Sequence, residues 1–82
     1  MNAMELKQLF IDTFKKNGKT PRILIIENEE YTWNGGQRIG NSTLFKYRHV
    51  KDVNDINKAP NEKQIMISND TLHQLELDMV GI

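Results

Sequence analysis

Residues 43–50 read TLFKYRHV, and their alternation decides the fold class. Successive side chains of a β-strand point to opposite faces. One set of alternate positions therefore shares one face, and the other set shares the opposite face. The first set is Phe45, Tyr47 and His49, and the second is Leu44, Lys46, Arg48 and Val50. The stretch predicts a strand with an aromatic face toward the core and a basic face toward solvent.

Earlier strand signals lie between Pro21 and this stretch. The run ILII at 23–26 is bounded by Pro21 and by acidic residues, which indicates a strand covered on both faces or close to it. Residues 30–33 alternate polar and aromatic side chains, so they predict a second strand, entered through a tight turn at residues 28–29. Residues 34–36, Asn-Gly-Gly, predict another turn because Asn and Gly accept positive φ at little cost. A short return strand at 37–39 and a turn at 40–42 would follow.

The glycines of this region come close to a phosphate-binding loop. Gly35 and Gly40 are spaced as in G-x-x-x-x-G-K-[ST], but Asn41 replaces the lysine. A strand pattern follows instead of the helix whose N-terminus would face a phosphate. The stretch therefore predicts two hairpin turns and no nucleotide site.

The sequence beyond residue 50 predicts a loop, then a strand, and then a final segment that has two interpretations. Residues 51–62 predict a loop, with Val53 and Ile56 as anchors against the core, and residues 63–68, KQIMIS, predict a strand. The last segment matches a helix that Asn69 or Asp70 would cap and Gly81 would end, and its strong helix formers favour that interpretation. Strand-like alternation over 75–79 remains the alternative. The helix would direct these side chains to the core: Leu72, Leu75 and Met79.

The N-terminal segment completes the fold prediction. Leu6, Phe10 and Phe14 repeat at four-residue intervals within 4–16, which predicts an amphipathic helix closed by Asn17-Gly18. We therefore expect one α+β domain over 1–82, with this helix packed on a mainly antiparallel sheet of four or five strands and a short C-terminal helix. The sheet order stays open. Residues 1–3 resemble an expression-tag remnant before a start at Met4.

Composition narrows the classes of function. Eleven basic and eleven acidic residues give zero net charge, and the chain has no cysteine. No apolar run approaches the ~20 residues of a membrane span, and no secretory signal is visible, so we expect a cytoplasmic protein without a membrane role. Abundant Asn, Ile and Lys indicate a bacterial or phage origin. The chain has no cysteine or elbow-type serine nucleophile, and the only ligand-spaced partner of His49 or His73 is Glu76, three residues after His73. Two residues bind zinc weakly, so we expect no enzymatic activity, metal or cofactor.

What remains is a binding or regulatory role through protein–protein contact, including self-association as a homodimer. The candidate partner-binding residues are Trp33, Arg38, Lys46, Arg48 and Lys51. Burial beneath the N-terminal helix is the alternative for Trp33. The alternative function is single-stranded nucleic-acid binding by the basic-aromatic stretch 43–51, which requires Trp33 or Tyr31 to share an exposed face with Lys46 and Arg48.

A third hypothesis is a small hydrolase or nucleotide binder. It requires a deep pocket that holds several of four residues. They are Glu27, Glu30, Arg38 and His49.

Overall fold

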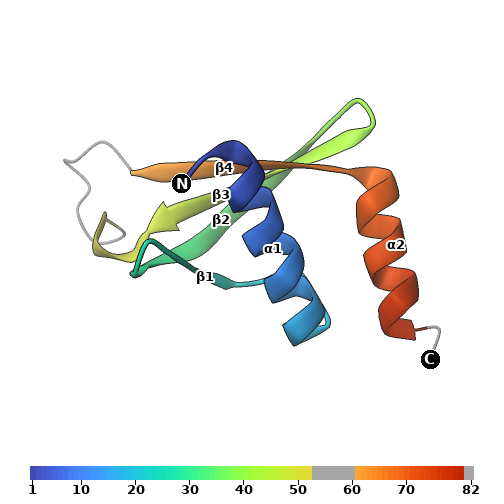
Figure 1. Cartoon of the computed structure of the whole chain (residues 1–82). Coiled ribbons are helices and arrows are strands. Elements are labelled where there is room, and N and C mark those ends of the chain that lie inside the picture. The colour runs from blue at the N-terminus through green and yellow to red at the C-terminus, as the bar shows by residue number, and fades with distance from the viewer. Residues whose placement is uncertain (53–60, 81–82) are drawn as a thin grey trace.

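The computed structural model describes residues 1–52 and 61–80 of the chain. The elements are α1 (Ala3–Asn17), β1 (Ile23–Ile26), β2 (Glu29–Ile39), β3 (Ser42–His49), the 3-10 turn η1 (Val50–Asp52), β4 (Glu62–Ser68) and α2 (Asn69–Val80). The strands form one antiparallel sheet in the order β1-β2-β3-β4, with a helix at each end of the chain (Figure 1). The predicted α+β class is confirmed, with four strands within the described residues.

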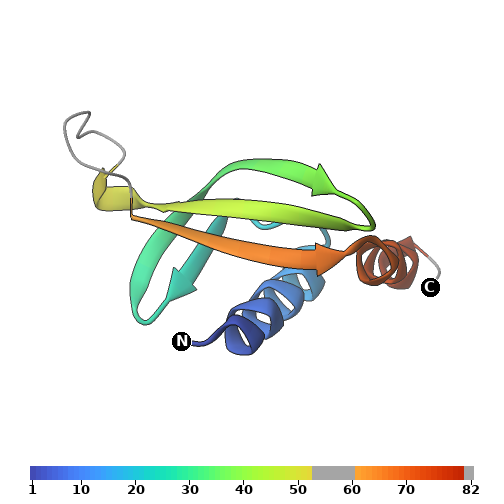
Figure 2. The ribbon, with the colours of Figure 1, turned by 90° about the horizontal axis from the view of Figure 1, so that it is seen from above.

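Helix α1 lies against one face of the curled sheet (Figure 2). Its start is capped by the Asn2 side chain, whose Oδ1 accepts the Glu5 N–H at 2.8 Å. Gly18 ends it in the left-handed conformation, with φ 74°, and donates its N–H to the Phe14 carbonyl. The predicted apolar stripe is buried against the sheet, and the Phe10 ring centroid lies 4.6 Å from that of Phe45.

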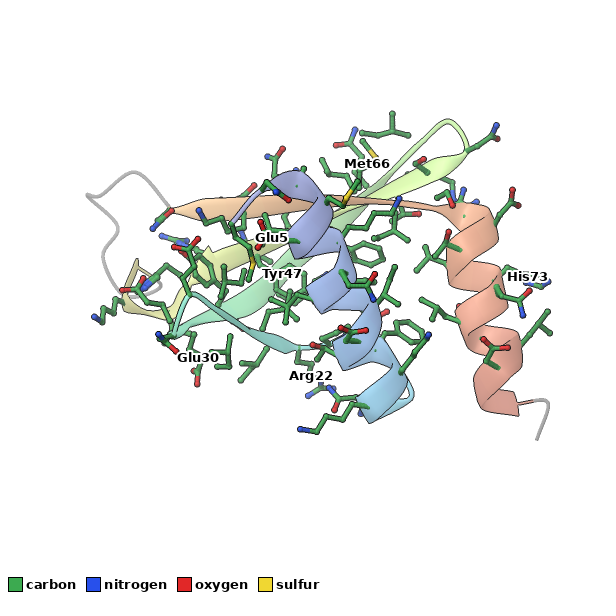
Figure 3. All side chains as sticks on the ribbon, viewed as in Figure 1. Glu5, Arg22, Glu30, Tyr47, Met66 and His73 are labelled. Atoms are coloured by element: carbon green, nitrogen blue, oxygen red, sulfur yellow. The ribbon has the colours of Figure 1, made fainter. Side chains whose placement is uncertain are left out.

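The core occupies the space between α1, α2 and the covered face of the sheet. Its members are Leu6, Phe10, Phe14, Leu24, Ile26, Tyr31, Phe45, Tyr47, Ile65, Ile67 and Leu75. The prediction that β1 is covered on both faces is wrong, because Ile23 and Ile25 are exposed on its other face. Tyr47 lies between α1 and the sheet (Figure 3), and its hydroxyl donates to the Pro21 carbonyl at 2.7 Å. Burial raises the pKa of Tyr47 because the phenolate would lose its hydration. One hydrogen bond therefore ties the chain after α1 to the centre of the sheet.

The predicted turn at residues 34–36 is wrong, because these residues lie inside β2. Trp33 pairs with Tyr47 and Gly36 pairs with Phe45, so two residues of β2 face the single Lys46 of β3. This extra residue is a β-bulge. Gly35 takes φ 106°, which side-chain-bearing residues rarely adopt. The bulge joins the two short strands predicted at 30–33 and 37–39 into one.

Two tight turns connect the first three strands. Glu27 and Asn28 form the loop between β1 and β2, one residue earlier than predicted, with φ values of 52° and 67°. The positive φ of both residues is typical of a type I′ hairpin. Gly40 and Asn41 form the second loop, where the sequence predicts a turn, and β3 follows it. The residues directly after this loop form a strand and not a helix, as predicted, and the first residue of α2, Asn69, donates its N–H to the Asn41 carbonyl at 2.8 Å.

The C-terminal segment is a helix, which decides between the two interpretations of its sequence. Leu75 is buried and Leu72 packs against the core. The predicted cap is wrong by one residue, because Ser68 accepts the Thr71 N–H at 3.2 Å. The predictions for Val53 and Ile56, the Met79 side chain and the Gly81 terminus lie outside the described residues. Neither helix, as far as the structure describes the chain, is long and apolar enough to cross a membrane.

Candidate partner-binding surface around Trp33

Trp33 is half-exposed beside an apolar groove. Its register with Tyr47 places it on the face of the sheet that α1 covers, yet 48% of the residue remains accessible. Its backbone N–H donates to the Arg22 carbonyl at 2.8 Å, which holds β2 against the chain just before β1. The groove has a volume of about 260 Å³, and its lining residues are Thr20, Pro21, Arg22, Trp33 and Phe45. Burial beneath α1, the alternative for Trp33, does not occur.

The groove depends on a missing side chain. Gly36 lies directly opposite Phe45 on β3, so no side chain from β2 covers the Phe45 ring at this point. A Cβ at Gly36 would lie 3.5 Å from the Leu44 carbonyl, an ordinary contact. The backbone around residue 36 therefore has room for a side chain. The effect of glycine at this position is to leave the groove open.

Four exposed cations lie in the chain that leads past the groove. They are Lys15, Lys16, Lys19 and Arg22. No acidic residue occurs between 13 and 26. Figure 3 shows Arg22 beside the lower, C-terminal end of α1, where the chain enters β1. Among residues 1–52 and 61–80, the N-terminal amine forms an ion pair with Glu27 and His49 forms a hydrogen bond with Glu29, so neither contact neutralises these cations. The groove therefore has basic surroundings.

Lys46 and Arg48 lie on the opposite face of the sheet from Trp33. Lys46 is paired with Gln64 and Arg48 with Glu62, all on the face that no helix covers. Tyr31 and Trp33 face the α1 side, since their partners are the buried His49 and Tyr47. The shared face that single-stranded nucleic-acid binding by 43–51 requires is therefore absent.

Arg38 and Lys51 line two other clefts. The Arg38 cleft, of about 410 Å³, lies between the β2–β3 hairpin and α2, and its other lining residues are Thr43, Asn69, Leu72, His73 and Glu76. The Lys51 cleft, of about 320 Å³, is lined by Asn28, Glu29, Glu30, His49 and Val50. The structure therefore does not bring the five predicted partner-binding residues onto one surface.

His49, in the Lys51 cleft, makes contacts that stabilise the fold. Its Nε2 lies 2.7 Å from the Glu29 carboxylate, and its Nδ1 accepts the Lys51 N–H at 3.2 Å. The Tyr31 ring meets the imidazole edge-on at 5.0 Å. A neutral imidazole with its proton on Nε2 satisfies both contacts. His49 thus holds η1 against β2.

The hydrolase or nucleotide-binder hypothesis requires groups that the structure separates. Glu30 and His49 share one cleft, whereas Arg38 lines another. Glu27 accepts a hydrogen bond from the N-terminal amine, and this bond, together with the positive charge of the amine, lowers the pKa of that carboxyl. Within the described ranges, no three His, Asp or Glu side chains are placed to hold a metal ion.

Sequence reasoning identified Trp33 but missed the rest of its groove. Pro21 and Phe45 were visible as a strand boundary and a core residue, and only the register between β2 and β3 joins them to Trp33. Comparison with models of protein families, with curated proteins and with solved structures gives no match. The functional argument therefore depends on the geometry of this chain.

Proposed function

We propose that this chain is a small, non-enzymatic, intracellular binding or regulatory protein that acts by contact with another protein. The half-exposed Trp33 beside an apolar groove is the observation that supports this proposal most. Tryptophan and arginine are enriched among residues that dominate binding energy, especially where they surround a pocket that excludes water. Here Trp33 and Arg22 flank the same groove.

The partner inserts one apolar anchor side chain between Trp33 and Pro21. Burial of an anchor against these side chains removes apolar surface of both proteins from water. The exposed lysines and Arg22 form a polar rim around this contact. Such a rim sets the rate and specificity of association more than its affinity.

A peptide library displayed on phage tests the proposal. The library is panned against the wild-type protein, with counter-selection against the Trp33→Ala variant. Enriched peptides should bind the wild type saturably and should bind Trp33→Ala at least about tenfold more weakly. Leu77→Ala is the matched control, since Leu77 is 49% exposed on α2. It should leave binding unchanged. Circular dichroism of both variants must match the wild type.

Enriched peptides that bind Trp33→Ala as well as the wild type would contradict the proposal. Absence of any enriched peptide would contradict it too. Titration with a mixed-sequence single-stranded oligonucleotide, followed by Trp33 fluorescence, checks the alternative. Saturable binding that weakens between about 50 and 200 mM salt would favour nucleic acid as the ligand.

A further inference from the structure

The groove around Trp33 opens onto an unoccupied strand position. Strand β1 pairs with β2 only over Glu29–Thr32, and the last contact on that side is the Trp33 N–H bond to Arg22. Beyond the bulge residues 34–35, residues 36–39 of β2 pair with β3 on one side. On the other side, no described strand lies next to them, and the hairpin extends past β1 in Figure 1. Six residues of strand give a free edge about 20 Å long.

The backbone of this edge presents hydrogen-bonding groups that no strand of the described residues pairs. Ile39 and Ser42 flank a two-residue loop, so they form the hydrogen-bonded pair that closes the hairpin. Hydrogen-bonded and non-hydrogen-bonded pairs alternate along an antiparallel ladder. Arg38 and Gly36 are therefore in non-hydrogen-bonded pairs, and their N–H and C=O groups point away from β3 toward the free edge.

Basic side chains lie near both ends of this free edge. Lys19 and Arg22 lie in the segment that ends next to Trp33, and Arg38 lies near the hairpin loop. Arg38 and Trp33 are on the same face of β2, because the bulge shifts the alternation by one residue. Between them, Gly36 leaves space above Phe45. An extended chain along this edge would meet cations at each end and the apolar groove near Trp33.

We propose that an acidic segment of the partner binds here as an added strand alongside residues 34–39, with one apolar side chain in the Trp33 groove. This inference rests on the proposed function and names the chemistry of its partner. In strand addition, main-chain hydrogen bonds supply affinity and alternate side-chain pockets supply specificity. Acidic side chains complement the basic surroundings, which lack a neutralising ion pair among the described residues. Unpaired backbone groups favour a peptide over a nucleic acid, which presents no strand edge.

The test uses synthetic peptides from the panning described above, without prior selection for charge. Acidic residues should be enriched on both sides of an apolar anchor. Bound peptide should slow amide hydrogen exchange at Gly36 and Arg38 at least about tenfold. Arg38→Pro removes the outward N–H, whereas Arg38→Ala removes only the charge. We expect Arg38→Pro to weaken peptide binding at least about tenfold and Arg38→Ala to weaken it about threefold or less.

The charge requirement has its own pair of variants. The double variant Lys19→Glu, Arg22→Glu should weaken binding of the acidic peptide at least about tenfold. It should weaken binding of an uncharged analogue of that peptide much less. Lys7→Glu, on the N-terminal half of α1, is the control and should change neither. Circular dichroism confirms that Arg38→Pro and the double variant are folded.

Two results would overturn the inference while the proposed function stands. One is a set of peptides that need Trp33 but carry no excess of acidic residues. The other is unchanged exchange at Gly36 and Arg38 when peptide is bound. Sedimentation that shows a dimer blocked by Arg38→Pro would assign the edge to a second copy of the chain, and would also overturn it. If no peptide depends on Trp33, the proposed function itself fails.

Discussion

Two adjacent glycines provide a sharp test of the bulge in β2. Gly35→Ala and Gly36→Ala add the same methyl group to neighbouring positions, but the backbone differs between them. Gly35 has φ 106°, whereas Gly36 has no positive φ. We therefore expect the two substitutions to change the free energy of unfolding in opposite directions.

The magnitudes follow from backbone conformation alone. A Cβ at Gly35 would meet nothing within 4 Å, so the cost comes from the disfavoured φ, about 1–3 kcal/mol. At Gly36 the new Cβ makes one ordinary contact, with Leu44. Replacing glycine within a strand there reduces the entropy of the unfolded chain and should stabilise by about 0.5–1 kcal/mol. The two variants should then differ by at least about 1.5 kcal/mol.

Urea denaturation followed by circular dichroism measures this difference. The midpoint should fall for Gly35→Ala and rise for Gly36→Ala, with no change in the slope of unfolding free energy against urea. A Gly35→Ala protein as stable as the wild type would refute the bulge geometry. Loss of stability in both variants would show that Gly36 is more crowded than the register indicates.

Three further predictions concern the core and the helix cap. Phe10→Ala should lower the free energy of unfolding by about 3–5 kcal/mol, against less than about 0.5 kcal/mol for the exposed Leu77→Ala, as measured by urea denaturation. Because burial raises the pKa of Tyr47 above its usual value of 10.0, the unfolded chain ionises first as pH rises. Stability should therefore be intact below pH 10 and then fall by up to about 1.4 kcal/mol per pH unit, and Tyr47→Phe should weaken this dependence in thermal melts from pH 8 to 11. Ser68→Ala removes the α2 cap and should cost about 1 kcal/mol by the same denaturation assay, whereas Ser68→Asp, which can still accept the Thr71 N–H, should retain most of it.

Local patterns predicted most of the architecture because they depend on spacing along the chain. The spacing of the apolar residues in 4–16 predicts a helix and shows which of its faces packs on the core. The alternation in 43–50 assigns Phe45 and Tyr47 to the core face of a strand. The C-terminal segment had two periodicities at once. Its structure was decided by Leu75, which packs into the core as part of a helix.

Asn-Gly-Gly illustrates a limit of local reasoning. Positive φ is equally useful in a hairpin turn and in a β-bulge, so residues 34–36 alone do not distinguish the two. Continuous pairing of β2 with β3 on both sides of Gly35 selects the bulge. The residues that flank the bulge, Trp33 and Gly36, pair with Tyr47 and Phe45 of the next strand, so the bulge is a property of the assembled sheet.

The sequence by itself determined the class of fold, the apolar face of α1 and the buried face of β3, and it selected candidate residues for binding. Only the tertiary structure decided which of those residues share a surface. The bulge reverses the alternation of side chains along β2, so Trp33 and Arg38 share the α1 side while Lys46 and Arg48 lie on the other. Spacing along one strand cannot reveal a register shift between two, because that shift depends on how distant segments pair.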